Sequence, residues 1–428
     1  MTTIAAKPRR RWFQFSLKSL MVLVVVVAVP CGWLKWKMVR GEKERATLAE
    51  IKRRGGTFEY DWQVASKTSA PGPAWLRKWL GDDFFAAVAS ITLAGKKRSL
   101  IGQPTDAKYR ASPGDIDPET RDDDLGLVGT FSSLEVLYVG SWIAGAPVEP
   151  FDSVGNTSDA GLFHLRRLAN LRCLSLVDAK ITDAGMLHLN GLTRLEELCL
   201  SGPGVTDASL VHINKFGMLK KLDLSGTSVT DAGMVHLDGL TRLEMLFLKG
   251  APITGAGFVH LKRLAHLKVL DLEISAVSDA GLSQLSELTS LKVLDLGQTA
   301  VSDAGLTQLK ELTGLKALNL GHTAVSDAGL VDLRGLKELE QLTLDGTDAT
   351  DAGLVHFESL SRLRSLSLDS TGVTNWGLFH FAGLSRLESL NLIRTRVTEA
   401  GVAELKRSLP NCKIYPYGVR GVGVGSSN

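Results

Sequence analysis

A unit of 24 residues recurs eleven times without insertion from Ser158 almost to the C-terminus of this 428-residue chain. A repeat of this length cannot bury its own apolar face, so the copies must stack on one another as a solenoid. Such a stack presents a long, regular surface, which favours a binding protein over an enzyme. One anchor position marks each copy: Asp159, Asp183, Asp207, Asp231, Gly255, Asp279, Asp303, Asp327, Asp351, Asn375 and Glu399.

Each copy predicts one short helix and one short strand. In the copy at residues 302–325, leucines recur every third residue over Leu306–Leu312, which indicates a helix with one apolar stripe. The alternating triplet Leu318–Leu320 indicates a strand. A Ser or Thr precedes every anchor and is expected to cap the helix, with the acidic anchor at the positive end of the helix dipole. A glycine two residues after most anchors weakens the helix, so we expect close packing there on the adjacent coil.

The alternation of strands and helices predicts a parallel sheet with right-handed crossovers. Strands stack about 4.8 Å apart, whereas helices side by side need about 10 Å. This mismatch makes each repeat a wedge, so the stack must bend. We expect the strands on the concave side and the helices on the convex side.

The pattern L-x-x-L-x-L-x-x-T-x-V-T/S-D-A-G-L-x-x-L resembles the leucine-rich repeat of the ribonuclease-inhibitor and F-box-adaptor type, over roughly residues 84–416. The resemblance implies an α/β leucine-rich repeat solenoid, a curved horseshoe with a parallel β-sheet on the concave face and short helices on the convex face. It also implies protein binding, which most of the family shares. In one departure, hydroxyl residues replace the usual Asn or Cys after the strand, and we expect them to satisfy backbone groups of the turn: Thr227, Ser275, Thr299, Thr323, Thr347, Thr371 and Thr395.

The sequence divides the chain into six segments: a basic tail (1–16), an apolar run (17–34), a juxtamembrane helix and strand region (35–83), two atypical capping repeats with polar insertions (84–157), the eleven repeats (158–416) and a Gly/Ser-rich tail expected to be disordered (417–428). A charged helix is expected from Glu42 to Arg54, and Thr57–Trp62 is a candidate strand. The second capping repeat begins at Asp122, where an imperfect copy of the leucine pattern starts.

The apolar run Leu17–Leu34 would span about 27 Å as a helix, just enough for a bilayer core. Arginines precede it, and tryptophans flank it where interfacial aromatic residues belong. We interpret it as an uncleaved transmembrane signal-anchor helix. The alternative is a cleaved signal peptide, for which Pro30 and Cys31 make a poor cleavage site. The flanking positive charges are balanced, and we expect the repeats outside the cytoplasm. The segments RRRWFQFSLKSL, GGTFEYDW and WLRKWLGDDFF resemble membrane-anchored leucine-rich repeat proteins of planctomycetes, which implies the same location.

The net charge of +3 is spread unevenly along the chain. Residues 1–55 hold thirteen Lys and Arg against three Glu, so the remainder is net acidic by about seven charges. A solenoid that binds nucleic acid needs positive charge along its groove. The charge distribution therefore argues against nucleic acid as the partner.

No motif for catalysis is present. The sequence has no phosphate loop, no HExxH and no G-x-S-x-G. Its four cysteines are too few for a disulfide framework. Cys173 and Cys199 are one repeat apart but two residues out of step, roughly 8 Å between Cα atoms, which is too far for a disulfide. We expect no enzyme activity, no cofactor, no metal and no small-molecule substrate.

Seven of the nine histidines form one column along the predicted helices: His164, His188, His212, His236, His260, His356 and His380. Neighbouring helices lie about 10 Å apart, whereas the ligands of one Zn²⁺ lie roughly 3–4 Å from each other. We interpret the column as a helix surface. A pH sensor and a metal site are the alternatives.

Residues between the strand leucines must point into the concave groove, because side chains alternate along a strand. Acids outnumber bases there by seven to two. The plain interpretation is a solvated sheet face, and the functional one is an acidic groove for a basic protein, with Met245 and Phe247 as the apolar contact. The candidate partner-binding residues are Glu197, Asp223, Met245, Phe247, Lys249, Asp271, Glu273, Asp295, Asn319, Asp345 and Asp369.

These features together predict a membrane-anchored protein-binding scaffold that works through its concave face. One alternative is an adaptor or a component like a ubiquitin-ligase effector, which requires a further domain. Residues 36–120 show no convincing one. A second alternative is a structural envelope protein that packs laterally through its convex face.

Overall fold

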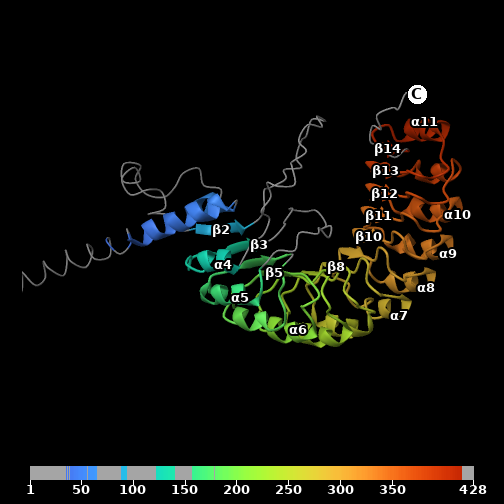
Figure 1. The fold of residues 1–428 in the computed structure, drawn as a ribbon. Coiled ribbons are helices and arrows are strands. Elements are labelled where there is room, and N and C mark those ends of the chain that lie inside the picture. The colour runs from blue at the N-terminus through green and yellow to red at the C-terminus, as the bar shows by residue number, and fades with distance from the viewer. Residues whose placement is uncertain are drawn as a thin grey trace, which may run out of the picture.

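The structure is a computed structural model that describes residues 35, 37, 39–54, 56–64, 88–93, 122–139, 157–177 and 179–416. The strands form one 14-stranded sheet in which spatial order follows sequence order (Figure 1). β1 (Thr57–Tyr60) pairs antiparallel with β2 (Val88–Leu93), and every later strand is parallel to the one before it. The later strands are β3 (Val136–Val139), β4 (Cys173–Leu176), β5 (Glu197–Leu200), β6 (Lys221–Asp223), β7 (Met245–Phe247), β8 (Val269–Asp271), β9 (Val293–Asp295), β10 (Ala317–Asn319), β11 (Gln341–Thr343), β12 (Ser365–Ser367), β13 (Ser389–Asn391) and β14 (Lys413–Tyr415).

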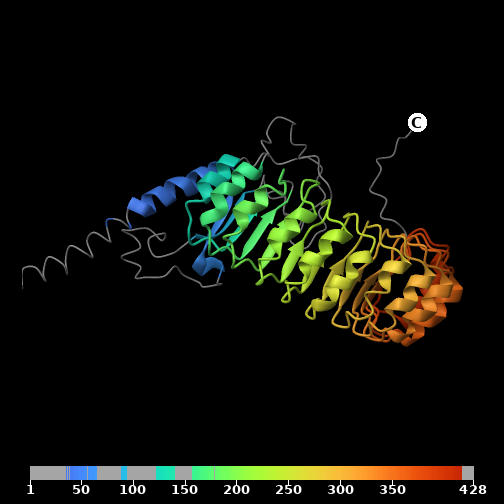
Figure 2. The ribbon, with the colours of Figure 1, turned by 90° about the horizontal axis from the view of Figure 1, so that it is seen from below.

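The array curves as the wedge argument predicts, with strands on the inner side and helices on the outer side (Figures 1 and 2). Several outer segments are wholly 3₁₀-helical, because one or two turns suffice to cross the outer face. The helices are α2 (Asp61–Val64), α4 (Asp122–Val128), α5 (Asp159–Leu162), η2 (Phe163–Arg167), η3 (Gly185–Leu189), α6 (Asp207–Ile213), η4 (Asp231–Leu237), η5 (Ala256–Arg263), α7 (Asp279–Leu282), α8 (Asp303–Leu306), η6 (Thr307–Leu309), α9 (Asp327–Leu330), η7 (Val331–Gly335), α10 (Asp351–Leu354), η8 (Val355–Ser359), η9 (Gly377–Phe381) and α11 (Glu399–Ser408).

One continuous apolar core runs the length of the array, and both of its ends are covered. At the N-terminal end a helix over residues 39–53 buries Leu48 and Ile51 against it. Arg54 then pairs with Asp124 of α4 at 2.6 Å. The leucine-pattern positions of the imperfect repeat that begins at Asp122, from Leu125 to Val139, are buried in the same core. The candidate strand at 57–62 is shorter than expected, because α2 begins at Asp61.

The predicted transmembrane helix 17–34, the basic tail 1–16 and the tail 417–428 lie outside the described residues. Most of the polar insertions of the capping repeats lie outside them too. In the part of the chain that the structure describes, no helix is long and apolar enough to cross a membrane.

The hydroxyl residues after the strands act as predicted. The Thr299 hydroxyl donates to the Leu296 carbonyl at 2.6 Å, within the turn that leaves β9. The same hydrogen bond, from the hydroxyl to the carbonyl three residues earlier, recurs for every member of the set. It is made by Thr227, Ser275, Thr323, Thr347, Thr371 and Thr395.

A carboxylate–hydroxyl bridge ties most repeats to the next. Asp303 Oδ1 accepts from the Ser326 backbone N–H at 2.7 Å, and Oδ2 accepts from the Ser326 hydroxyl at 2.6 Å. That hydroxyl also accepts from the Ala328 N–H at 3.3 Å and so caps its own helix. The anchor acid, expected to serve only the dipole of its own helix, therefore also binds the following repeat. The bridge recurs at Asp122–Ser158, Asp159–Thr182, Asp183–Thr206, Asp207–Thr230, Asp231–Thr254, Asp279–Ser302, Asp327–Thr350, Asp351–Thr374 and, with an amide, Asn375–Thr398.

The bridge also accounts for the glycine near most helix starts. A Cβ at Gly329 would lie 2.4 Å from Asp303 Oδ1, too close for an apolar side chain. In α6 the position is Ser209, whose hydroxyl donates to the bridging carboxylate of Asp183 at 2.5 Å. The expected close packing of the helix start on the adjacent coil is thereby confirmed. At one step the bridge is absent, because Gly255 takes the anchor position and Ser278 makes no side-chain cap bond. There a Cβ on Gly255, whose φ is +98°, would lie 2.5 Å from the Gly281 Cα, so backbone packs on backbone.

We predict that Asp303→Ala lowers the free energy of unfolding by about 1.5–3 kcal/mol, because it leaves the N–H and hydroxyl of Ser326 without their charged acceptor. Urea unfolding measures the change. Glu311→Ala, on the exposed outer surface, is the control and should change it by less than about 0.5 kcal/mol. Equal losses in the two variants would show that the bridge does not couple repeats.

Candidate functional site: the concave face of the sheet

The strand register lines up one residue per repeat along the middle of the concave face. Leu294 of β9 is fully buried, whereas Val293 and Asp295 on either side of it are half-buried, as alternation requires. Each residue of the central column pairs with the equivalent residue of the next strand. The column is Ser175, Cys199, Asp223, Phe247, Asp271, Asp295, Asn319, Thr343, Ser367 and Asn391.

Three carboxylates meet near the centre of this column. One oxygen each from Asp271, Glu273 and Asp295 lies within 4.8 Å of the others. Lys249 Nζ contacts Glu273 Oε2 at 2.6 Å. Asp295 Oδ1 accepts from the Gly297 N–H and from Asn319 Nδ2, both at 2.9 Å. We call Asp271, Glu273 and Asp295 the central acidic cluster.

The central acidic cluster is short of positive charge. Burial raises the pKa of Asp271 to about 6, and the neighbouring Asp295 and Glu273 add to the rise. Burial likewise raises the pKa of Asp295, with Glu273 contributing. Burial lowers the pKa of Lys249. The hydrogen bond to Glu273 raises it by more, so the pKa of the Lys249 ammonium lies above its ordinary value. One lysine thus faces three carboxylates, which suit either a cationic side chain or a hard divalent cation by their chemistry.

Farther toward the C-terminus, the groove acids already have partners. Asp369 forms two hydrogen bonds with the Arg394 guanidinium, at 2.7 and 2.8 Å, and this contact lowers the pKa of Asp369. Asp345 Oδ1 accepts from the Ser367 hydroxyl at 2.5 Å and from the Asp369 N–H at 2.8 Å. The structure therefore separates Asp345 and Asp369 from the central acidic cluster, although the sequence pattern had counted them together.

The N-terminal part of the groove is more apolar. Lys221 Nζ lies 5.4 Å from the centre of the Phe247 ring. Burial raises the pKa of the Cys173 and Cys199 thiols to about 12, so neither is a thiolate nucleophile at neutral pH. Neither cysteine forms a disulfide, and Cys173 lies opposite Glu197 rather than Cys199, as the two-residue offset predicts.

Sequence reasoning missed a row of groove-edge residues that follow the strands. Ile274, Gln298 and Arg394 have positive φ values of 55–60°. Gln298 Nε2 donates to Glu273 Oε1 at 3.2 Å. Ile274 is 48% exposed, and a β-branched side chain in the left-handed region is strained. The sequence did contain a signal for this conformation. Other repeats have glycine at the same position, at Gly226, Gly250 and Gly346, and glycine is typical of a left-handed backbone.

The histidine column lies on the outer helices, where the acidic partners of His260 and His380 belong to the preceding repeat. His380 Nδ1 contacts Glu358 Oε1 at 2.7 Å, and His260 Nδ1 contacts Asp238 Oδ1 at 3.5 Å. Among the described residues, the only group of three metal-ligating side chains within reach of one ion is the central acidic cluster, which contains no histidine.

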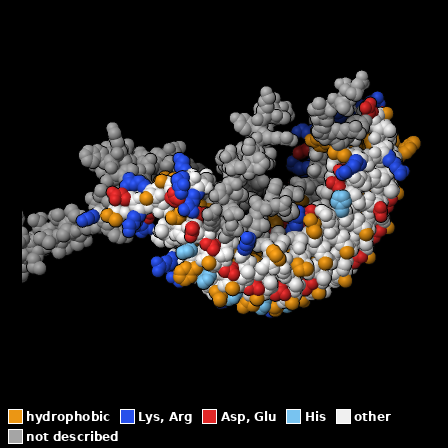
Figure 3. Space-filling view, viewed as in Figure 1, with side chains coloured by type: hydrophobic (Ala, Val, Ile, Leu, Met, Phe, Trp, Pro, Cys, Tyr) orange, Lys and Arg blue, Asp and Glu red, His pale blue; other side chains and the backbone are white. Residues whose placement is uncertain are grey.

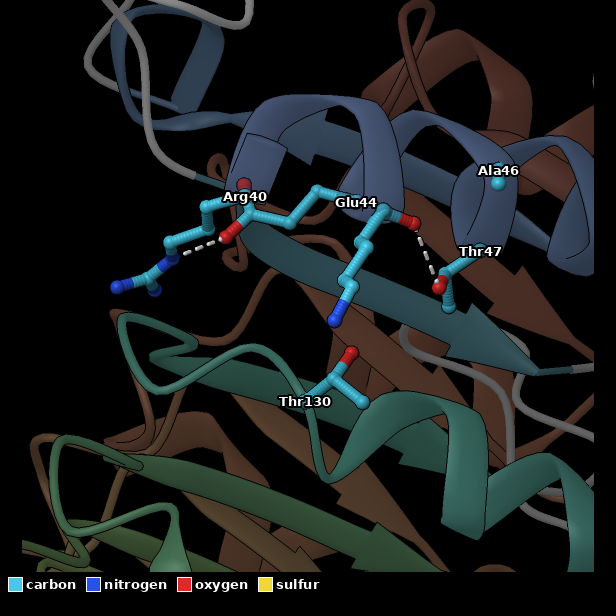
Figure 4. Close-up of a pocket in the computed structure, with 6 residues that line it drawn as sticks. Arg40, Glu44, Ala46, Thr47 and Thr130 are labelled. Carbon is cyan, nitrogen blue, oxygen red and sulfur yellow. Dashed lines mark hydrogen bonds and ion pairs between the residues drawn. The ribbon is translucent and has the colours of Figure 1, made fainter. Parts of the chain in front are cut away.

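A hollow of about 420 Å³ lies between the helix of residues 39–53 and Thr130 (Figure 4). Arg40 and Glu44 in its wall pair with each other at 2.7 Å, and the Thr47 hydroxyl donates to the Lys43 carbonyl. Arg40 also donates to the Ser132 hydroxyl at 3.1 Å, so several polar groups of this wall are engaged by the protein itself.

A family model described as Leucine Rich repeat matches residues 218–237. An internalin of Listeria monocytogenes is 21% identical over 73% of this chain and 92% of its own, with a TM-score of 0.51. The fold is that of a leucine-rich repeat protein. An internalin C2 of the same organism is 23% identical over 54% of this chain and 83% of its own, with a TM-score of 0.38. A leucine-rich repeat protein of Leptospira interrogans is 16% identical over 68% and 80%, with a TM-score of 0.44. A search of curated protein sequences found no match.

The raised pKa of Asp271 generates a prediction about stability. Its folded-state pKa of about 6 lies above the ordinary value of 3.8, so the folded leucine-rich repeat array binds the proton more tightly than the unfolded chain. The stability gained from protonation is complete below pH 3.8 and is lost as pH rises through about 6. Asp271→Asn should therefore stabilise the protein at pH 7 by about 1–3 kcal/mol, since one pKa unit corresponds to about 1.4 kcal/mol.

Thermal unfolding at several pH values measures this gain, which should vanish near pH 4. Asp369→Asn is the control of opposite sign, because Arg394 lowers the pKa of Asp369. It should destabilise the protein at pH 7. A loss of stability in Asp271→Asn at pH 7 would contradict the assigned electrostatics.

Proposed function

We propose that this leucine-rich repeat protein binds a basic segment of another protein in its concave groove. The observation that carries the proposal is the excess of carboxylate in the central acidic cluster, where Lys249 is the one cation in contact among the residues that the structure describes. An arginine or lysine from a partner would supply the missing charge and relieve the repulsion that helps to raise the pKa of Asp271.

Apolar groups beside the cluster support the same partner chemistry. Met245 and Phe247 lie on β7, one strand before Asp271, and the exposed Ile274 follows Glu273 directly. Aromatic, Met and other apolar side chains bury well at the centre of an interface, while a charged pair fixes the register. A basic peptide with an apolar residue next to its cation fits this surface.

The groove variants should separate the roles of charge and apolar contact. Changing Asp271, Glu273 and Asp295 to Lys should slow association with the partner and flatten its salt dependence, because these half-buried charges guide the encounter. Phe247→Ala should raise the dissociation rate by about tenfold, because it removes apolar area buried in the complex and leaves the electrostatic field of the groove unchanged. The partner is first captured by cross-linking in native membranes, and surface plasmon resonance then gives both rates.

The control is charge reversal at Lys310 and Glu311 on the outer face, which should leave binding unchanged. Loss of binding in that control, with binding retained in the groove variants, would show that the partner binds the outer helical face and not the groove.

We also propose that residues 17–34 anchor the protein in a membrane as an uncleaved helix. What supports this is the apolar run itself and the basic and tryptophan residues that flank it. The mature chain should then begin near Met1 and stay with membranes after a carbonate wash. Soluble protein whose N-terminus lies near residues 29–33 would refute the anchor. A reporter fused after Asn428 would show which side the repeats face.

A further inference from the structure

A ladder of charged side chains runs along one rim of the concave groove. The inner side of the curved array is hollowed (Figure 3), and the N-terminal ends of its parallel strands share one rim of that hollow. The residue directly before each strand from β3 to β13 is charged. We call these residues the rim ladder: Glu135, Arg172, Glu196, Lys220, Glu244, Lys268, Lys292, Lys316, Glu340, Arg364 and Glu388.

Backbone hydrogen bonds hold neighbouring members of the rim ladder side by side. The Lys292 N–H donates to the Lys268 carbonyl at 2.7 Å, and the Lys316 N–H donates to the Lys292 carbonyl at 2.8 Å. The same bond joins every consecutive pair from Glu135 to Glu388. Consecutive members therefore stand about one strand spacing, roughly 4.8 Å, apart. At this separation opposite charges attract and like charges repel.

The charges alternate in sign along the rim ladder except at one place. Neighbours of opposite charge contact each other at 2.6–3.7 Å, in the pairs Glu135–Arg172, Arg172–Glu196, Glu196–Lys220, Glu244–Lys268, Lys316–Glu340, Glu340–Arg364 and Arg364–Glu388. Lys292 has lysine on both sides and, in the part of the chain that the structure describes, no carboxylate partner. A carboxylate at position 292 would make the signs alternate without a break from one end of the ladder to the other.

The ammonium of Lys292 has open space beside it. A Cβ built on Gly314 would lie 2.7 Å from Lys292 Nζ, so a larger residue there would crowd the ammonium. The equivalent positions in the two neighbouring repeats carry larger side chains, Ser290 and Glu338. Lys292 is therefore a half-buried cation with room next to it and like charges on either side, a position that attracts an anion from outside the chain.

The break in the rim ladder lies beside the central acidic cluster. Lys268 directly precedes β8, which ends at Asp271, and Lys292 directly precedes β9, which ends at Asp295. Three residues of extended chain span about 10 Å. The middle of the groove therefore has surplus positive charge at its rim and surplus negative charge about 10 Å away along the same strands. A segment that carries only a cation would match half of this arrangement.

We propose that Lys292 binds an acidic side chain of the segment that occupies the groove, and so fixes the direction in which that segment crosses the strands. This inference rests on the function proposed for the groove. The segment places its cation on the central acidic cluster and a carboxylate at the break in the rim ladder. Complementary charge at two points sets orientation and register, and the reversed segment is disfavoured because it brings like charges together.

A short proline-linked peptide presents the two charges at this separation. A polyproline II segment has about three residues per turn and rises about 3.1 Å per residue, so side chains three residues apart lie on one side, about 9 Å from each other. The probe is an amidated, fluorescently labelled peptide of leucine, arginine, two prolines and glutamate, in that order. A second peptide has glutamine in place of the glutamate and therefore lacks only the carboxylate.

Fluorescence anisotropy of the full-length protein with the two peptides at neutral pH tests the proposal. Lys292→Gln should weaken binding of the glutamate peptide by about fivefold to tenfold and leave the glutamine peptide within about twofold. Lys292→Glu should weaken the glutamate peptide further. Its thermal unfolding midpoint should stay at or above that of the unsubstituted protein, because the change completes the alternation of charge.

The matched control is Lys220→Gln, which removes the same charge from the same ladder. Glu196 keeps its contact with Arg172 in this variant. Lys220 lies three strand spacings from Lys292, about 14 Å, which is beyond the screening length at physiological salt. Both peptides should therefore bind within about twofold of the unsubstituted protein. A loss equal to that of Lys292→Gln would overturn the proposal, because it would assign the effect to net charge.

Asp271→Asn separates this inference from the function on which it rests. It removes one charge of the central acidic cluster, so it should weaken both peptides equally, since both carry the arginine. If it does so while Lys292→Gln fails to distinguish the two peptides, the groove function stands and the role of Lys292 is overturned. If Asp271→Asn leaves both affinities unchanged, or if neither peptide binds, the groove function fails and the role of Lys292 fails with it.

Discussion

The carboxylate–hydroxyl bridge between consecutive repeats is the interaction on which the rest of the structure depends. Leucine packing supplies the bulk of the stability, but it is non-directional and does not by itself set where one repeat sits on the next. At most steps the anchor carboxylate accepts from the N–H and the hydroxyl of the following cap, as Asp303 does for Ser326. This contact holds the helix starts in line. The strands keep the same register from one repeat to the next, so that side chains 24 residues apart form columns.

Much of this architecture could be predicted from the sequence, because the period and the leucine spacing are strictly local signals. The parallel order, the caps and the hydroxyl turn bonds follow from residues within one copy. The bridge was missed because its two halves lie one repeat apart, as in Asp327 and Thr350. Within a single copy, the anchor acid was equally well explained by its position at the positive end of its own helix dipole.

The groove was predicted less completely than the fold. The central column follows from alternation alone, so its register was predictable. Charge balance was not, because it depends on partners in neighbouring columns. Arg394 neutralises Asp369 from a left-handed position that the strand pattern does not mark. The central acidic cluster keeps its excess charge because the nearby cation, Lys249, is shared among three acids.

The missing bridge at Gly255 has a consequence for how the array opens. In a linear stack each unit touches only its neighbours, so cooperativity must pass through every junction in turn. At the Gly255 junction two glycine backbones pack where the other steps have a side-chain bridge. This junction lacks that coupling contact, so subglobal unfolding should separate the chain into two cooperative blocks at this seam. The seam runs between η5 and α7, so β8 and β9, which carry the central acidic cluster, lie on opposite sides of it. A ligand that contacts all three acids would therefore tie the two blocks together across the seam.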